Sequence, residues 1–495
     1  MWFYKHFMGE VIETRCGVCV THSLHDAYSF LKSLQHRGRD TASITAISGS
    51  RIDVLKYAGE VRRFDLETVI RNFQEINKTD ESNKGNAYHT FFGHVRYATS
   101  GIDTSDVLKY AHPAVLGGTV IEKGNHVYHI DCDAALVHNG QIDMNNSVLA
   151  PYAGGVGFDT ELLLRYLKEE GYRRTMQNIQ GSYFLAFAEK GKDTIVMRDR
   201  HGIMPGVIGR KDKKFVFASE DAALRKNGAR VIKDVEPGRV YLIRPNGLDL
   251  NYDEVMGGDP RHCFFQGNYI ASPESTIDDL AVGTLRRMLG EKLAEIVKPE
   301  VDIVTYLPTC PEISAMSYAD KRGLPFKEVF YKLNKERSFL GRDKEDRRSS
   351  IERNLYIQPI IDGVLAGDYL RGKSIGVVDD SIVRGNNAAY ARDLLKVNGV
   401  REIHLISYTP KIGIVGSDGV KRGCSFGIDM PPDDSFVVRS EDGTRNRTDE
   451  EINQVMGINV HYMPYEAMLE VFERMGMPRN SLCTFCIGGS HPFSA

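Results

Sequence analysis

The sequence predicts an α/β and α+β protein in which a sheet-rich N-terminal domain precedes a doubly wound parallel sheet. From Cys16 to about Ile243, short alternating or apolar runs are separated by Gly and Asp turns, a pattern typical of a sheet with few helices. Beyond a linker bearing Pro245 and Pro260, helical patterns alternate with apolar strands, as in parallel sheets with crossover helices. The length of 495 residues suffices for two domains that each bury a core.

Two helices are expected to interrupt the first sheet. Residues 23–35 place apolar side chains at helical spacing, and residues 160–169 are dense in leucine, while runs such as 194–197 and 215–218 indicate strands. The second domain is expected to contain, in order, helix 278–297, strand 301–307, helix 312–321, strand 374–378, helix 386–397 and strand 402–408. The charged stretch between residues 334 and 353 is either a surface loop or a lid over an anionic substrate.

Composition limits the partners. A net charge of −3 provides no basic field for nucleic acid or an anionic membrane, and no apolar run is long enough to cross a bilayer. The first fifteen residues lack the apolar core of a secretory signal, so we expect a cytoplasmic protein. Eight cysteines in such a chain indicate metal ligation, catalysis or core packing before disulfides.

The run from Gly372 to Gly385 carries the strongest chemical signal. An apolar strand delivers Asp379 and Asp380 onto a loop that opens a helix. Carboxylates there can accept hydrogen bonds from ribose hydroxyls or face hydrated Mg²⁺, and the N–H groups after Arg384 can bind a phosphate. An ordinary turn with a solvated acidic pair is the alternative for Asp-Asp alone. The full string resembles the phosphoribosyl pyrophosphate (PRPP) loop of type I phosphoribosyltransferases.

Five strings in the first half share a second resemblance. In order, these are Cys16–Val20, Leu34–Gly38, Gly93–Thr99, Val137–Gly140 and Phe158–Glu161. They resemble the glutaminase domain of class II glutamine amidotransferases, N-terminal nucleophile (Ntn) hydrolases with an αββα fold. The resemblance implies that Cys16 attacks the glutamine amide and that its own α-amino group, with a reference pKa of about 7.7–8.0, is the base. Residues 1–15 are therefore expected to be a propeptide.

The same resemblance assigns the other glutamine-site residues. Arg96 would bind the α-carboxylate and Asp159 the α-ammonium, while the Asn139 side chain and the Gly140 N–H would form the oxyanion hole. Taken singly, Arg96 and Asp159 could instead form a surface ion pair, and Asn139-Gly140 is a dipeptide that favours a type I′ hairpin turn.

Four cysteines in the second half form a candidate metal site. They are Cys263, Cys424, Cys483 and Cys486, the last two in a C-x-x-C pair. Spacing alone leaves [4Fe–4S] and structural zinc open, and unrelated buried cysteines remain an alternative. Resemblance to the iron–sulfur branch of amidophosphoribosyltransferases implies a [4Fe–4S] cluster.

Resemblance to that family extends from Cys16 to Cys486. It implies a glutaminase at 16–245, a phosphoribosyltransferase at 261–470 and a cysteine-bearing segment at 471–495. The implied reaction moves ammonia from glutamine to PRPP, gives 5-phosphoribosylamine for purine biosynthesis and uses Mg²⁺. The PRPP contacts would be Asp379, Asp380, Ser381, Arg384, Gly385, Asn386, Asn387, Arg337 and Arg347, with Asp379, Asp380 and, as a doubtful ligand, Cys310 near Mg²⁺. A homodimer or homotetramer inhibited by purine nucleotides is expected.

The PRPP motifs depart from the family pattern at three places. Asn386 and Asn387 replace two threonines, Pro308-Thr309-Cys310 lacks the usual acid, and Gly341–Lys344 in the lid lacks the usual Pro and Gln. A thiol suits Mg²⁺ poorly, because this ion prefers oxygen ligands. The alternative function is therefore a glutaminase whose second half only binds PRPP or a nucleotide as a regulatory module. A sugar-phosphate amidotransferase is disfavoured, because Asp379 to Gly385 has no place in its isomerase domain.

Overall fold

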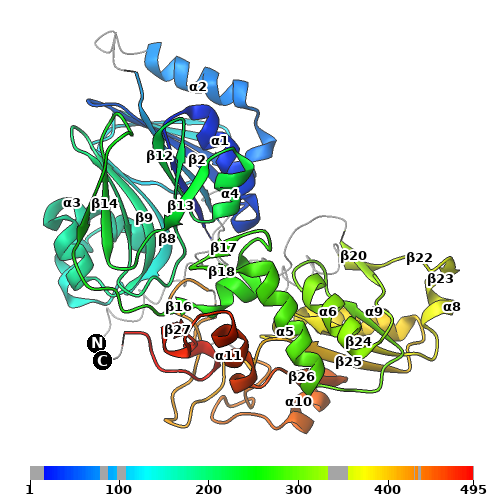
Figure 1. The fold of residues 1–495 in the computed structure, drawn as a ribbon. Helices are drawn as coiled ribbons and strands as arrows, with labels where there is room; N and C mark the ends of the chain where they lie inside the picture. Colours follow the sequence, from blue (N-terminus) through cyan, green and yellow to red (C-terminus); the bar gives the residue numbers. More distant parts are fainter. Residues whose placement is uncertain are drawn as a thin grey trace.

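The computed structural model of the chain describes residues 16–78, 87–96, 107–332, 355–428, 430–432 and 436–493. Two units are visible, a stack of two sheets between helices and a smaller parallel sheet flanked by helices (Figure 1). Within these residues no helix is both long and apolar enough to span a bilayer.

The first unit is a four-layer αββα sandwich, as the sequence predicts. One sheet has nine strands in the spatial order β13 (Arg230–Asp234), β11 (Val207–Lys211), β12 (Lys214–Ala218), β1 (Gly17–Thr21), β4 (Thr90–Arg96), β2 (Thr41–Ile47), β3 (Ile52–Ala58), β7 (His126–Ile130) and β6 (Thr119–Lys123). The other has six, in the order β15 (Leu250–Glu254), β14 (Arg239–Ile243), β10 (Thr194–Arg198), β9 (Gly181–Glu189), β8 (Ala134–Ile142) and β5 (Ala114–Leu116). The pairs within both sheets are antiparallel.

Helices cover the outer faces of this sandwich. They are α1 (Leu24–Ser33), α2 (Leu66–Lys78) and α4 (Asp221–Lys226) beside the nine-stranded sheet and α3 (Asp159–Asn178) on the six-stranded one, with short turns η1 (Gln35–Arg37), η2 (Val61–Arg63) and η4 (Ser147–Tyr152). Helix α1 begins after Ser23, whose side chain accepts a hydrogen bond from the Asp26 N–H at 3.1 Å. Strand β15 lies beyond residue 245, where we expect the first domain to end, and pairs with β14, so this sheet continues to Glu254.

The second unit is a parallel sheet in the order β19 (Ile303–Tyr306), β24 (Ser374–Asp379), β25 (Glu402–Ser407) and β26 (Asn459–Tyr462). A parallel bridge between Val304 and Phe326 adds the chain after α6 to the opposite edge, so the strand order reverses between β19 and β24. Ligands bind at such a switch point in doubly wound sheets. The helices are α5 (Val282–Ile296), α6 (Glu312–Arg322), α8 (Ala366–Leu370), α9 (Asn386–Val397), α10 (Asp449–Met456) and α11 (Tyr465–Arg474).

Short ribbons and turns complete the second unit. They are β16 (His262–Cys263) with β27 (Leu482–Cys483), β17 (Thr276–Ile277) with β18 (Leu280–Ala281), β20 (Phe330–Lys332) with β21 (Leu355–Ile357), β22 (Ile360–Ile361) with β23 (Val364–Leu365), and the turns η5 (Gln266–Ile270), η7 (Arg479–Ser481) and η8 (Phe485–Ile487). The helix predicted from residue 278 begins only at Val282. Asp278 and Asp279 have φ values of 49° and 63° and form the turn between β17 and β18, so the prediction was wrong for these residues.

One apolar cluster joins the two units. It contains Val18 and Phe184 from the space between the two large sheets, and Leu285 and Ile375 from the second unit. Because the apolar contacts are continuous, the sites of both units are held on one packed framework.

Candidate functional site

The candidate nucleophile lies next to the middle of the nine-stranded sheet. Cys16 directly precedes β1, is fully buried, and its carbonyl oxygen accepts a hydrogen bond from Arg37 Nε at 3.0 Å. Gly17 pairs with Val95 in antiparallel register, which brings Cys16 to the end of β4 where Arg96 stands. The predicted propeptide, residues 1–15, lies outside the described residues.

Arg96 is a buried cation, and some of its hydrogen-bond donors have no partner among the described residues. Its Nη1 donates to the Tyr110 carbonyl, whereas Nε and Nη2 have no hydrogen-bond partner in the described part of the chain. Burial lowers the pKa of Arg96, and the charges of Cys16 and Asp159 act in the opposite direction. A buried guanidinium with open donors is suited to a carboxylate, which rules out the surface-pair alternative for this residue.

Asn139 and Gly140 lie inside a strand and not in a turn. Both residues belong to β8 and pair with Phe184 and Tyr183 of β9, so the hairpin-turn alternative is wrong. The Asn139 side chain is fully buried, and neither Oδ1 nor Nδ2 has a hydrogen-bond partner among the described residues. Gly140 has φ 149°, and a Cβ atom there would lie 1.9 Å from the Ser182 carbonyl oxygen. Only glycine fits this backbone position.

Asp159 completes the first site from the start of α3. Its Oδ1 accepts from the Thr160 N–H at 2.7 Å and its Oδ2 from the Ile142 N–H at 3.3 Å, at the end of β8. The carboxylate therefore stands at a helix N-terminus, which stabilises its charge. The charges of Cys16 and Asp159 both act on Arg96, so these three residues from different elements lie near one another.

The second site lies at the switch point of the parallel sheet. Asp379 ends β24, and Asp379 Oδ1 accepts from the Asp380 N–H at 2.9 Å. Ser381 Oγ donates to Asp380 Oδ1, also at 2.9 Å. Burial, together with the neighbouring Asp380 charge, raises the pKa of Asp379 well above its usual range. Two crowded carboxylates of this kind favour a cation or hydroxyl donors between them.

The loop after this pair presents a helix start. Gly385 takes φ 76°, and α9 begins at Asn386 without a side-chain cap on its first N–H groups. Such N–H groups suit a phosphate. Asn386 is exposed, while Asn387 and Arg384 are half-buried beside it.

Cys310 follows β19 at the same edge of the sheet. Its Sγ contacts the carbonyl oxygens of Tyr269 and Asn268, at 3.5 and 3.6 Å, and the Tyr408 hydroxyl at 3.6 Å. The thiol thus packs against η5. Arg337 and Arg347, the predicted lid contacts, lie outside the described residues.

The four candidate cysteine ligands line one cavity. Cys263 in β16 pairs in register with Cys483 in β27, and Cys424 and Cys486 complete the lining of a small cavity. Its other walls are mainly apolar, including Ile203, Phe426 and Phe485. Burial raises the pKa of Cys263 to about 12, and the neighbouring Cys424 adds to this effect. Across the described ranges, no group of three or more His, Cys, Asp or Glu side chains is arranged to hold a metal ion.

Sequence reasoning missed three residues that join the sites. Arg37 donates to Glu220 Oε1 at 2.6 Å and to Gln266 Oε1 at 3.1 Å, and all three residues are buried. Arg37 stands in the string Leu34–Gly38, but nothing in the sequence pairs it with residues about two hundred positions away.

Comparisons with known proteins agree with this geometry. The glutamine amidotransferase domain family matches residues 121–226. The amidophosphoribosyltransferase of Mycobacterium tuberculosis is 28% identical over 94% of this chain and 83% of its own length. That of Archaeoglobus fulgidus is 28% identical over 94% of both chains. The solved structure of glutamine PRPP amidotransferase from B. subtilis, complexed with ADP and GMP, aligns with a TM-score of 0.73 at 24% identity, covering 96% of this chain and 97% of that one, and so shares the fold.

Proposed function

We propose that this chain is a glutamine-dependent amidophosphoribosyltransferase that makes 5-phosphoribosylamine from PRPP and glutamine in purine biosynthesis. One observation carries the proposal. The same chain holds a buried cysteine near the unpaired donors of Arg96, and paired aspartates before an uncapped helix. The near full-length similarity to amidophosphoribosyltransferases agrees with both halves.

The glutaminase half supplies ammonia. Arg96 and Asp159 would bind the α-carboxylate and α-ammonium of glutamine, which orients the side-chain amide toward Cys16. The Cys16 thiol loses its proton to the freed α-amino group and attacks the amide carbon, while Asn139 Nδ2 and the Gly140 N–H stabilise the oxyanion. Ammonia leaves with the transferred proton, and water then hydrolyses the thioester to glutamate.

The phosphoribosyl half would bind PRPP at the switch point. Asp379 and Asp380 accept hydrogen bonds from the ribose hydroxyls, and the N–H groups at the start of α9 bind the 5-phosphate, with Ser381 and Arg384 in the loop between them. Ammonia displaces pyrophosphate at C1 of the ribose. The crowded pair Asp379 and Asp380 fits a divalent cation, because a cation would relieve the repulsion that raises the pKa of Asp379. Mg²⁺, when bound, supplies positive charge for the pyrophosphate.

A [4Fe–4S] cluster is the group that the resemblance implies for the cysteine cavity. Four thiols line a mostly apolar cavity, and four thiolates suit either a cluster or zinc, so the metal is decided by experiment. A [4Fe–4S] cluster there would tie the segment after α11 to β16. Anaerobically purified protein should show visible absorption that oxygen removes and that Cys486→Ala lacks; stoichiometric zinc without iron would contradict the cluster.

Pyrophosphate release tests the function as a whole. Purified protein should release pyrophosphate only when PRPP is supplied together with glutamine or ammonia. Cys16→Ala should keep residues 1–15, use ammonia and fail with glutamine. Glutamine hydrolysis without any pyrophosphate release would contradict the proposal and favour the regulatory-module alternative.

A further inference from the structure

Arg37 connects the backbone of Cys16 to the second domain. Its three guanidinium nitrogens each have a different partner: Nε donates to the Cys16 carbonyl at 3.0 Å, Nη1 to Glu220 at 2.6 Å and Nη2 to Gln266 at 3.1 Å. The side chain is fully buried. A planar guanidinium bonded at all three nitrogens is held in one orientation, so the peptide plane after Cys16 is fixed by groups outside the glutamine site.

The Glu220 carboxylate is hydrogen-bonded to Arg37 in the first domain and to residues of the second domain. Its Oε1 accepts from Arg37 and from His36 Nε2 at 2.9 Å, while its Oε2 accepts from the Ser272 N–H at 3.0 Å and Ser275 Oγ at 2.7 Å, both in the second domain. Burial disfavours the charge, but His36 and Arg37 still hold the pKa of Glu220 well below its usual range. The carboxylate is therefore ionised and bonded on both sides of the domain boundary.

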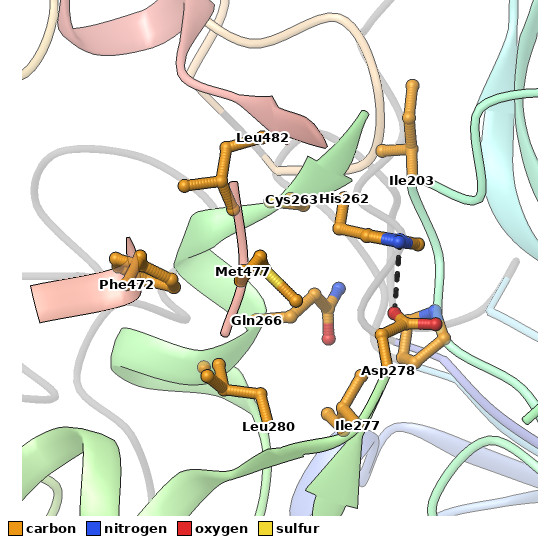
Figure 2. Close-up of a pocket in the computed structure, with 12 residues that line it drawn as sticks. Ile203, His262, Cys263, Gln266, Ile277, Asp278, Leu280, Phe472, Met477 and Leu482 are labelled. Carbon is orange, nitrogen blue, oxygen red and sulfur yellow. Dashed lines mark ion pairs between the residues drawn. The ribbon is translucent and has the colours of Figure 1, made fainter. Parts of the chain in front are cut away.

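Gln266 is the second residue at the domain boundary that bonds Arg37. It opens η5, a single π-helical turn, and lines a small pocket (Figure 2). Figure 2 shows Ile203 of the first domain, Leu280 of the second and Met477 of the C-terminal segment around it. All three parts of the chain thus fix the position of Gln266.

The far side of η5 reaches the PRPP site. The Asn268 carbonyl accepts from the Tyr408 hydroxyl at 2.7 Å, and the Tyr408 N–H donates to the Asp379 carbonyl at 3.2 Å. Bonded groups therefore run without a break from Cys16 through Arg37, Gln266 and η5 to the strand end that carries Asp379.

We infer that Arg37 is a positioning residue of the glutamine site, and that Glu220 and Gln266 make the orientation of Cys16 depend on the second domain. The inference rests on the proposed function, in which Cys16 is the nucleophile. Arg37 bonds the carbonyl of Cys16 and not the glutamine, so its effect falls on the attack and not on glutamine binding.

Gln266→Met tests this with little change of volume. We expect kcat for glutamine hydrolysis to fall about tenfold or more, with KM changed by less than about threefold. The rate at which iodoacetamide alkylates Cys16 should fall in parallel, while ammonia-dependent pyrophosphate release stays at the wild-type rate. Arg37→Lys, which keeps the charge but loses the fork of donors, should show the same pattern more strongly.

The control is Gln454→Met, an exposed residue of α10 in the same domain, which should leave every rate unchanged. Wild-type alkylation and hydrolysis rates in Gln266→Met would overturn the inference, even if Arg37→Lys failed to fold. An equal loss of the ammonia-dependent rate would also overturn it, because that result indicates general damage. Failure of the proposed function would appear instead in the wild type, as absence of glutamine hydrolysis or of pyrophosphate release.

Discussion

At the scale of single residues, replacing the buried amide of Asn139 should affect catalysis much more than stability. Both amide atoms lack a partner among the described residues, so the side chain contributes little to folding as it stands. We predict that Asn139→Leu lowers kcat for glutamine hydrolysis by about 10²–10³, the usual loss for one oxyanion-hole donor. Steady-state assays and urea unfolding measure the two effects, and the free energy of unfolding should change by less than about 1 kcal/mol.

Asn268→Leu provides the matched control. Asn268 is equally buried, but its Nδ2 donates to Thr409 Oγ1 at 3.1 Å. Its replacement leaves a buried partner unsatisfied and should reduce stability by about 1–3 kcal/mol. Equal stability losses in the two variants, with kcat retained in Asn139→Leu, would refute the oxyanion role.

Asp379 makes stability depend on pH. Burial and the charge of Asp380 raise the pKa of Asp379 above its usual value of 3.8, so the folded protein holds this proton to higher pH than the unfolded chain. Stability must then fall as pH rises from the unfolded pKa toward the folded one. Asp379→Asn lacks the titrating carboxylate, so this fall of stability with rising pH should be absent. We predict that its stability advantage over the wild type grows between acidic and neutral pH.

Urea unfolding at a series of pH values, without PRPP or Mg²⁺, measures that difference. Asp368→Asn, which removes an exposed carboxylate in α8, is the control and should show no such growth. A pH-independent difference for Asp379→Asn would mean that Asp379 is ionised without strain in the folded protein.

At the scale of elements, the sequence predicted those helix bounds that depend on residues close together in the chain. Helix α9 has the bounds 386–397 expected from the sequence, since Gly385 and the apolar spacing mark its start and its face. The helix expected from residue 278 fails at its start, because two aspartates at positive φ form a hairpin turn that periodicity cannot reveal. The chain order likewise could not show that β16 pairs with β27 and so brings Cys263 beside Cys483.

The turn into α9 gives a prediction for PRPP binding. A Cβ atom on Gly385 would lie 2.7 Å from Met456 Sδ, and the residue has φ 76°. Gly385→Ala strains the turn and pushes the Met456 side chain against the start of α9, and we predict that KM for PRPP rises by about tenfold or more while glutamine hydrolysis without PRPP stays unchanged. Gly419→Ala shares the backbone strain, with φ 75°, but meets nothing within 4 Å, so it should leave KM unchanged. Equal KM values in the two variants would contradict a phosphate site at this turn.

At the scale of the whole molecule, sequence motifs located both candidate sites but not the bonds between them. Arg96, Asn139 and Asp159 follow from strings that resemble a known domain, and their surroundings fit those roles. Arg198 and Asp278 belong to no such string. Their buried ion pair joins β10 to the second domain with contacts of 2.6 and 2.8 Å, and this could be found only in three dimensions.

This pair predicts how the domains unfold. Asp278 also lies 3.1 Å from His262 Nδ1 (Figure 2), so Asp278→Asn removes the carboxylate that bonds the buried Arg198 and faces His262. Removing one partner of a buried pair costs about 3–5 kcal/mol. Because one apolar cluster spans both domains, we expect the wild type to unfold in a single calorimetric transition and Asp278→Asn to unfold in two, at a lower temperature.

The control is Asp249→Asn, which breaks an exposed pair with Arg244, at 3.9 Å, and should change stability by less than about 1 kcal/mol. If the two variants melt alike, the Arg198–Asp278 ion pair contributes nothing to holding the first domain on the second.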